Sequence, residues 1–173
     1  MKLTEYFYTP RMQAKRIHAN DFEDIRLMHQ DPQAMKTLGG VRSLETSQQN
    51  MIWNLQLWET HGIGLWVFRE PQSLTFIGLG GLRYLSILGV QELDLGYCLM
   101  PHYWGQGLGT EMAKASVSMG FEHRQANNIV ACTQVSNQAS RHIMEKLHFC
   151  YEKEFEQFGQ PHVLYRLNKT RQL

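Results

Sequence analysis

Apolar residues recur along this chain with two different periods, and each period predicts one kind of element. Near the amino end, Phe22, Ile25 and Met28 follow one another at helical spacing, up to a stop at Asp31 and Pro32. In the middle of the chain the spacing changes to the two-residue period that is typical of strands. The whole pattern predicts helices over residues 22–30, 44–61, 108–123 and 137–147, and strands over residues 65–69, 74–85, 91–99, 128–135, 149–158 and 163–168.

Polar residues mark the starts of the first two helices. Asn20 and Glu23 have the spacing of a capping box, and Ser43 can cap the second helix. The buried face of the second helix is expected to contain Leu44, Met51, Ile52, Leu55 and Trp58. In the helix over residues 108–123 the expected buried residues are Leu108, Met112, Ala115 and Met119.

The order of these elements predicts a mixed α/β (α+β) fold, with one twisted, mostly antiparallel sheet and helices on both of its faces. The connection from the strand near Leu95 through a helix to the strand near Val130 should be a right-handed parallel crossover. No internal repeat and no Pro/Gly/Ser-rich linker divides the sequence. Residues 1–173 are therefore expected to form a single domain.

Charge and cysteine content narrow the classes of partner and compartment. The chain has 17 Lys and Arg residues against 16 Asp and Glu residues, so it has no strong basic field for nucleic acid. Cys98, Cys132 and Cys150 are far apart and odd in number, which predicts reduced thiols packed in the core of a cytoplasmic protein. Neither an apolar leader nor a run of about 18 apolar residues occurs, so neither a signal peptide nor a membrane span is expected.

Three alternating glycines, Gly105, Gly107 and Gly109, lie between a predicted strand and a predicted helix. Their spacing fits neither the P-loop nor the dinucleotide fingerprint. Glycines at this place let backbone N–H groups converge on an anion at the positive end of the helix dipole, and a diphosphate is the natural ligand. A tight turn without a ligand is the alternative interpretation.

The chain resembles the GNAT acetyltransferases, and within them the branch of bacterial ribosomal-protein N-terminal acetyltransferases. The resemblance extends from about Arg16 to Leu167 and is carried by GYCLMPHYWGQGLGTEM at residues 96–112, NQASRHIMEKLHF at 137–149 and HANDFEDIRLMHQDPQAM at 18–35. It implies the GNAT fold with a splayed central pair of parallel strands, acetyl-CoA as cofactor, no metal, and direct acetyl transfer to a primary amine. The amine partner is a protein N-terminus or a small molecule such as an amino sugar, polyamine or antibiotic. A non-catalytic acyl-CoA sensor is a further alternative, and the chain is a monomer or a homodimer.

The same resemblance implies where the cofactor binds. Backbone N–H groups hold the pyrophosphate, and the strand before the loop pairs its backbone with the pantetheine arm. Trp104 stands where the family usually has Gln or Arg, which leaves the main chain as the expected cradle. Asn137 is expected to contact the cofactor, to cap its helix, or both. The implied cofactor-binding residues are Tyr97, Cys98, Leu99, Gly105, Gln106, Gly107, Leu108, Gly109, Thr110 and Asn137.

Two residues are candidates for the proton transfers. Glu92 and Asp94 lie on one face of their strand by its period of two, and Asp94 matches the acidic position of the family, so it is the candidate base, acting through water. The alternative is that Asp94 satisfies a loop or a helix end. Glu92 is expected to be a solvated edge residue. Ser140 is implied near the cofactor sulfur as the group that assists the departing thiolate.

Other reactive residues have simpler interpretations. Cys98 is not needed as a nucleophile, because acetyl-CoA is already an activated thioester. His142, His148 and Cys150 lack the spacing of a metal site. Glu111 is expected to face sideways in a structural role, since it would repel a diphosphate. The tryptophans Trp53, Trp58 and Trp66 are expected in the core, and the alternative is that they form the floor of a substrate pocket.

Overall fold

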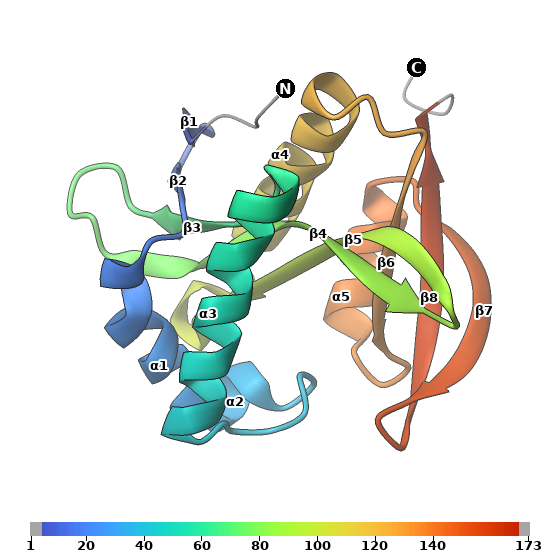
Figure 1. The fold of residues 1–173 in the computed structure, drawn as a ribbon, viewed down its shortest axis with the longest axis horizontal. Coiled ribbons are helices and arrows are strands. Elements are labelled where there is room, and N and C mark those ends of the chain that lie inside the picture. The colour runs from blue at the N-terminus through green and yellow to red at the C-terminus, as the bar shows by residue number, and fades with distance from the viewer. Residues whose placement is uncertain (1–4, 170–173) are drawn as a thin grey trace.

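The structure is a computed structural model and describes residues 5–169. Eight strands form one sheet in the order β1-β2-β3-β4-β5-β6-β8-β7 (Figure 1). Neighbouring strands pair antiparallel except β5 and β6, which are parallel, so the predicted mixed sheet and the parallel crossover are confirmed. The strands are β1 Tyr6–Tyr8, β2 Gln13–Arg16, β3 Leu65–Arg69, β4 Phe76–Ile87, β5 Val90–Leu99, β6 Asn128–Gln134, β7 Cys150–Gln157 and β8 Gln160–Asn168.

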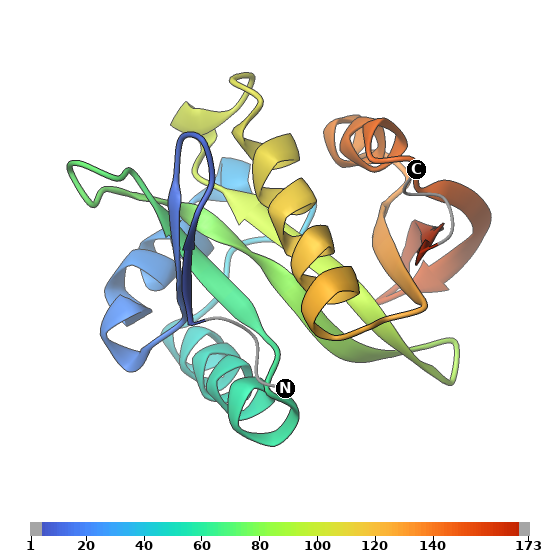
Figure 2. The same cartoon turned by 90° about the horizontal axis from the view of Figure 1, so that it is seen from above.

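Helices cover both faces of this sheet. Figure 2 shows α4 and α5 on one side and the group α1 to α3 on the other. The helices are α1 Phe22–Gln30, α2 Pro32–Met35, α3 Leu44–His61, α4 Leu108–His123 and α5 Gln138–Lys146, with short 3-10 turns at Ala19–Asp21 and Pro101–Tyr103. No helix within residues 5–169 combines the length and apolar character needed to cross a membrane.

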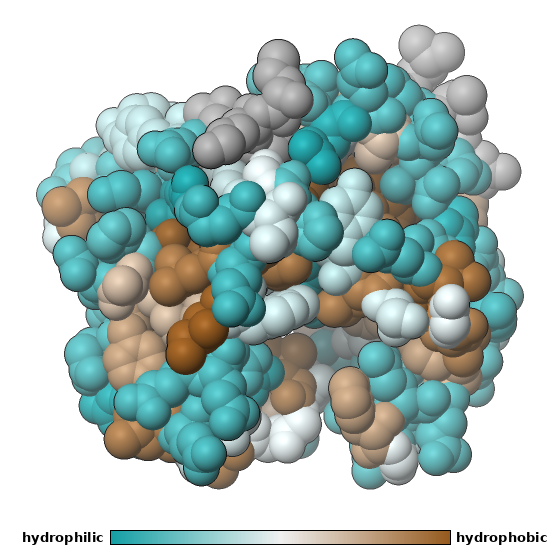
Figure 3. Space-filling view, in the orientation of Figure 1, coloured by the Kyte–Doolittle hydropathy of each residue, from teal (hydrophilic) through white to brown (hydrophobic). Residues whose placement is uncertain are grey.

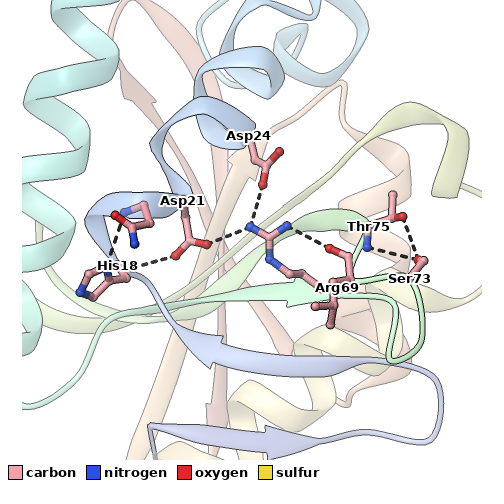
Figure 4. A network of polar contacts seen from close by, with 8 residues as sticks. His18, Asp21, Asp24, Arg69, Ser73 and Thr75 are labelled. Atoms are coloured by element: carbon pink, nitrogen blue, oxygen red, sulfur yellow. Dashed lines mark hydrogen bonds and ion pairs between the residues drawn. The ribbon is translucent and has the colours of Figure 1, made fainter.

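The start of α1 differs from the predicted capping box. The His18 backbone N–H donates to the Asp21 carboxylate at 2.9 Å, and the Asn20 N–H donates to the His18 ring at 3.5 Å, so the box belongs to His18 and Asp21. A 3-10 turn precedes the helix and displaces its cap. Arg69 on β3 then fixes this turn, because its Nη2 lies 2.9 Å from the Asp21 and 2.7 Å from the Asp24 carboxylate (Figure 4).

The pattern of apolar residues does not predict three elements near the amino end, namely β1, β2 and α2. The strands of the β1–β2 hairpin are only three and four residues long, which is too short to show a period. Asp31 and Pro32 were expected to stop a helix, but they also start α2, where the Asp31 carboxylate accepts the N–H groups of Gln33 and Ala34 at 2.8 and 2.9 Å. In the last hairpin, Gln160 belongs to β8, so the turn is shorter than predicted.

The helix faces were predicted only in part. In α3, Met51 and Trp58 are buried as expected, but Leu44 and Ile52 are 53% and 55% exposed, because the buried face is turned toward Ser47 and Asn54. In α4, Leu108 and Met112 are buried, whereas Ala115 and Met119 are only half-buried. α4 also approaches the sheet closely at Gly120, where an added Cβ would lie 2.6 Å from Leu82 Cδ1. A period of large apolar residues cannot find a contact made by a small one.

The three cysteines do not all lie in the core, as they were expected to. Cys98 and Cys132 are half-buried, while Cys150 is exposed at the start of the β7 edge strand, which corrects the expectation of a buried thiol. Trp58 and Trp66 are core residues as predicted. Trp53 is only half-buried, and the Arg83 guanidinium carbon lies 5.9 Å from the centroid of its ring, so Trp53 lies at the edge of the core and not inside it.

Candidate active site

The site lies where the two parallel strands diverge. β5 and β6 are in register at Asp94 and Val130, yet β5 continues to Leu99. Figure 3 shows the surface hollowed into a cleft between the half of the molecule with α1 to α3 and the half with α5, β6 and β8. Asp94 and the residues after it on β5 therefore lead from the last paired position into the diverging part of the sheet.

The glycine loop connects β5 to α4 and presents free backbone donors. Gly105 and Gly107 have φ values of +74° and +78°, a left-handed conformation that favours glycine. The first intrahelical hydrogen bond of α4 runs from the Glu111 N–H to the Gly107 carbonyl at 3.1 Å. The N–H groups of Leu108, Gly109 and Thr110 precede that bond and so lie at the positive end of the helix dipole. The predicted anion cradle therefore has the donors that it needs.

The flanking residues of the loop have packing roles. Gly109 lies in the first turn of α4, where an added Cβ would be 3.1 Å from Ile143 Cδ1, so its small size lets α4 approach α5. The Trp104 indole N–H donates to the Leu99 carbonyl at 3.0 Å and holds the loop against the end of β5. Trp104 thus supports the main chain of the loop, which is consistent with a cradle made of backbone groups.

Arg11 also belongs to this site, although the sequence did not indicate it. It lies in the β1–β2 turn, and its Nη1 donates to the Gln106 carbonyl of the glycine loop at 2.7 Å. Its Nε contacts the Glu111 carboxylate at 2.7 Å, and the Thr9 hydroxyl donates to the same carboxylate at 2.6 Å. Partial burial raises the pKa of Glu111, but these hydrogen bonds outweigh it and the net pKa is lowered. Glu111 therefore faces the hairpin, as expected, and the hairpin anchors the loop.

Asp94 is a buried acid with a raised pKa. Its side chain is 3% exposed and accepts a hydrogen bond from Arg83 Nε at 3.1 Å across the β4–β5 ladder. Burial raises the pKa of Asp94 to about 6, although Arg83 and a hydrogen bond from the Cys132 backbone act in the opposite direction. Asp94 caps no helix. An acid that titrates near neutral pH is suited to accept a proton.

Glu92 was expected to be a solvated edge residue, and this is wrong. Its carboxylate is 15% exposed and forms a forked ion pair with Arg166 of β8, at 2.6 and 3.0 Å. Arg166 also donates to Asn128 Oδ1 at 2.6 Å. Glu92 therefore joins β5 to the strands on the far side of the cleft, with both of its carboxylate oxygens bound to Arg166.

Tyr97 and the amino end of α5 face each other across the diverging strands. The Tyr97 and Ser140 hydroxyl groups are 2.8 Å apart, and burial raises the pKa of Tyr97 to about 12. Asn137 caps α5 by accepting the Ser140 N–H at 3.2 Å. Its amide hydrogens go to Thr37 and Thr133, both at 3.0 Å, so only Oδ1 retains capacity for a cofactor. The predicted cap is confirmed, and the predicted cofactor contact of Asn137 stays a prediction.

Comparison with known proteins decides the family. Residues 11–150 match the family described as acetyltransferase (GNAT) domain. The chain belongs to the GNAT acetyltransferase family. Members of this family use acetyl-CoA to acetylate amines, so the protein is an N-acetyltransferase with acetyl-CoA as its cofactor.

The relatives of this GNAT protein align with it over most of their own length. The YkkB protein of Bacillus subtilis (strain 168) is 26% identical over 139 residues, which cover 80% of this chain and 81% of YkkB. The acetyltransferase from Agrobacterium tumefaciens str. C58 superposes with a TM-score of 0.85 at 20% identity, covering 96% and 95% of the two chains. The ribosomal-protein-S5-alanine acetyltransferase from Vibrio fischeri superposes with a TM-score of 0.80 at 17% identity, covering 96% and 97%. The superpositions show that the GNAT fold is shared.

The residues of this GNAT site fit acetyl-CoA. An added Cβ would meet nothing within 4 Å at Gly105 and only Arg11 Nη2, at 3.4 Å, at Gly107, so the approach to the backbone donors is open. Cys98 contacts the Ala34 carbonyl at 3.9 Å, and burial raises the pKa of its thiol to about 12. A protonated thiol is a poor nucleophile, which agrees with direct transfer. Within residues 5–169 no group of three His, Cys, Asp or Glu side chains is arranged to hold a metal ion.

Proposed function

We propose that this GNAT enzyme acetylates the α-amino group at the N-terminus of a protein or peptide. The observation that carries the proposal is the buried Asp94, whose pKa is raised to about 6. Freeing an α-amino group of its proton at pH 7 costs about 1–1.4 kcal/mol, whereas a lysine costs about 4.6 kcal/mol. A weak base of this kind suits the first acceptor. The V. fischeri enzyme, whose fold is shared, is named for an alanine of a ribosomal protein and adds support.

The proposed roles follow from the positions of the side chains. Acetyl-CoA supplies an activated thioester when it is bound. The N–H groups of Leu108, Gly109 and Thr110 would hold its diphosphate. Asp94 would receive the proton of the acceptor ammonium through a water molecule, because its carboxylate is buried. Ser140, in contact with Tyr97, would donate a hydrogen bond to the departing thiolate. We also infer a cytoplasmic location, since Cys98 and Cys132 are free thiols, which are typical of reducing compartments.

A panel of amines tests the acceptor class. The panel contains peptides with free N-termini, N-terminally blocked peptides with one lysine, polyamines and aminoglycosides, and the readout is acetyl-CoA-dependent thiol release with mass-spectrometric location of the acetyl group. We expect the highest kcat/KM for peptides with free N-termini. A higher kcat/KM for a polyamine or an aminoglycoside would show that the acceptor is a small molecule and not a protein. Binding of acetyl-CoA with no turnover on any amine would instead indicate a sensor.

Replacement of Ser140 by Ala should lower kcat by about tenfold or more, since it removes one hydrogen bond to the leaving group. The KM for acetyl-CoA should stay within about twofold of wild type, because the diphosphate cradle is untouched. Steady-state kinetics at saturating acetyl-CoA measure both values. Ser86→Ala, at an exposed position of β4, is the matched control. An unchanged kcat in Ser140→Ala would remove Ser140 from the reaction.

A further inference from the structure

Arg42 lies in the segment between α2 and α3 and has no carboxylate partner within residues 5–169. Its Nη1 lies 2.9 Å from Nε2 of His29, and its backbone N–H donates to the His29 carbonyl at 2.9 Å. Arg83 and Arg166, by contrast, each pair with an acid on β5. The half-buried charge of Arg42 is thus held in place without being neutralised.

His29 cannot supply the missing negative charge. Its ring is 4% exposed, and burial together with the charge of Arg42 lowers the pKa of His29 to about 4. The ring is therefore neutral near pH 7. Its Nδ1 lies 3.1 Å from the Ser47 hydroxyl, which leaves Nε2 as the acceptor for Arg42. The arrangement orients the guanidinium group and leaves its remaining N–H groups for another acceptor.

Arg42 lies near the part of β5 that carries Cys98, four residues beyond the candidate base. Its guanidinium interacts electrostatically with the Cys98 thiol and with Arg83, the ion-pair partner of Asp94. Asp94, Gly96 and Cys98 lie on the same face of β5, because side chains alternate along a strand. Arg42 thus faces the stretch of β5 that leads away from Asp94 into the diverging part of the sheet. This stretch has two guanidinium groups for one buried carboxylate.

The segment that carries Arg42 is anchored at both ends. Thr37 accepts a hydrogen bond from Asn137 of α5 at 3.0 Å, and Arg42 is tied to His29 of α1. Gly39 and Gly40, with φ values of +92° and +86°, make the turn between these two anchors. The segment therefore joins the two halves of the molecule on either side of the cleft, and the guanidinium is placed before any acceptor arrives.

We propose that Arg42 binds a carboxylate of the acceptor, so that the preferred acceptor is an N-terminus with an acidic side chain close to its α-amino group. The inference rests on the proposed acetylation of N-termini and specifies its substrate class. An Arg–carboxylate pair is a strong, directional contact in a partly buried site and needs a charged partner to compensate its desolvation. The carboxylate of a free amino acid has the same chemistry, and the experiment separates the two sources.

The experiment compares matched acceptors with wild-type enzyme and three variants. The acceptors are peptides that begin Ser-Asp or Ser-Asn, and a free amino acid with its amide. The variants are Arg42→Gln, which keeps an N–H for His29, Arg42→Lys, which keeps the charge, and Lys114→Gln, which removes a charge from an exposed position of α4. Acetyl-CoA affinity and thermal midpoint are measured for each variant to confirm that the fold is retained.

For wild-type enzyme, kcat/KM should be higher for the Ser-Asp peptide than for the Ser-Asn peptide by about tenfold or more. In Arg42→Gln, kcat/KM for the Ser-Asp peptide should fall by about tenfold to a hundredfold, because the ion pair is lost. In the same variant, kcat/KM for the Ser-Asn peptide should change by less than about twofold. Arg42→Lys should retain part of the preference, and Lys114→Gln all of it. Equal kcat/KM for both peptides in wild type, or the same preference in Arg42→Gln, would overturn the inference while leaving N-terminal acetylation intact. Activity confined to the free amino acid, and lost with its amide, would keep the role of Arg42 but overturn the peptide acceptor.

Discussion

Replacement of Asp94 by Asn is expected to lower kcat by about a hundredfold or more, because a positioned general base contributes on this scale. Wild-type activity should fall as pH decreases through about 6, since Asp94 accepts a proton only when ionised and its pKa is raised to about 6 by burial. The variant should lose this acidic limb. The rise toward pH 8, which reflects deprotonation of an α-amino acceptor, should remain in both enzymes. Profiles of kcat/KM against pH at saturating acetyl-CoA measure both limbs.

Glu92→Gln is the matched control for this prediction. It removes the neighbouring carboxylate on the same face of β5, and it should keep the acidic limb while weakening the contact with Arg166. Asparagine at position 94 can still accept the Arg83 hydrogen bond, so acetyl-CoA affinity should be unchanged. An Asp94→Asn enzyme that retains wild-type kcat and the same acidic limb would assign the proton transfer to another group.

Gly107→Val should weaken acetyl-CoA binding by about tenfold or more and abolish the thermal stabilisation that acetyl-CoA confers. Gly107 has a φ of +78°, which a β-branched residue adopts only with strain. A side chain there would also reach Arg11 Nη2, which lies 3.4 Å from the added Cβ. Moving the loop would displace the N–H donors of α4, each of which would contribute a charge-assisted hydrogen bond to the diphosphate in the proposed site. Calorimetric titration and thermal shift measure the change.

Gly159→Val separates the cradle from general backbone strain. Gly159 has a φ of +70° in the β7–β8 turn, with nothing within 4 Å of an added Cβ. The two substitutions therefore impose a similar local cost, but only one lies in the proposed cofactor site. Equal acetyl-CoA affinities for the Gly107 and Gly159 variants would place the diphosphate away from the glycine loop.

Local patterns predicted the elements that build the site because they depend on neighbouring residues. The run of helix formers after Gly107 predicts α4, and the glycines themselves mark backbone that only glycine adopts without strain. The period of two along β5 placed Asp94 and Glu92 on one face. The same period does not distinguish their roles. One is buried with Arg83, and the other is bound to Arg166, whose position is 74 residues further along the chain.

By itself, then, the sequence determined the order of most elements, the glycine loop between β5 and α4, and the acidic strand that leads to that loop. The binding of an anion at this loop stays a prediction. The tertiary structure alone decided which charges meet. Arg11 and Glu111 are 100 residues apart in the sequence. The β1–β2 hairpin, which carries Arg11 to Glu111, has strands too short to show a period of apolar residues. The raised pKa of Asp94 and the uncompensated charge of Arg42 also come from burial among distant segments. Backbone conformation is set by adjacent residues, whereas burial and ion pairing are set by whatever the fold brings alongside.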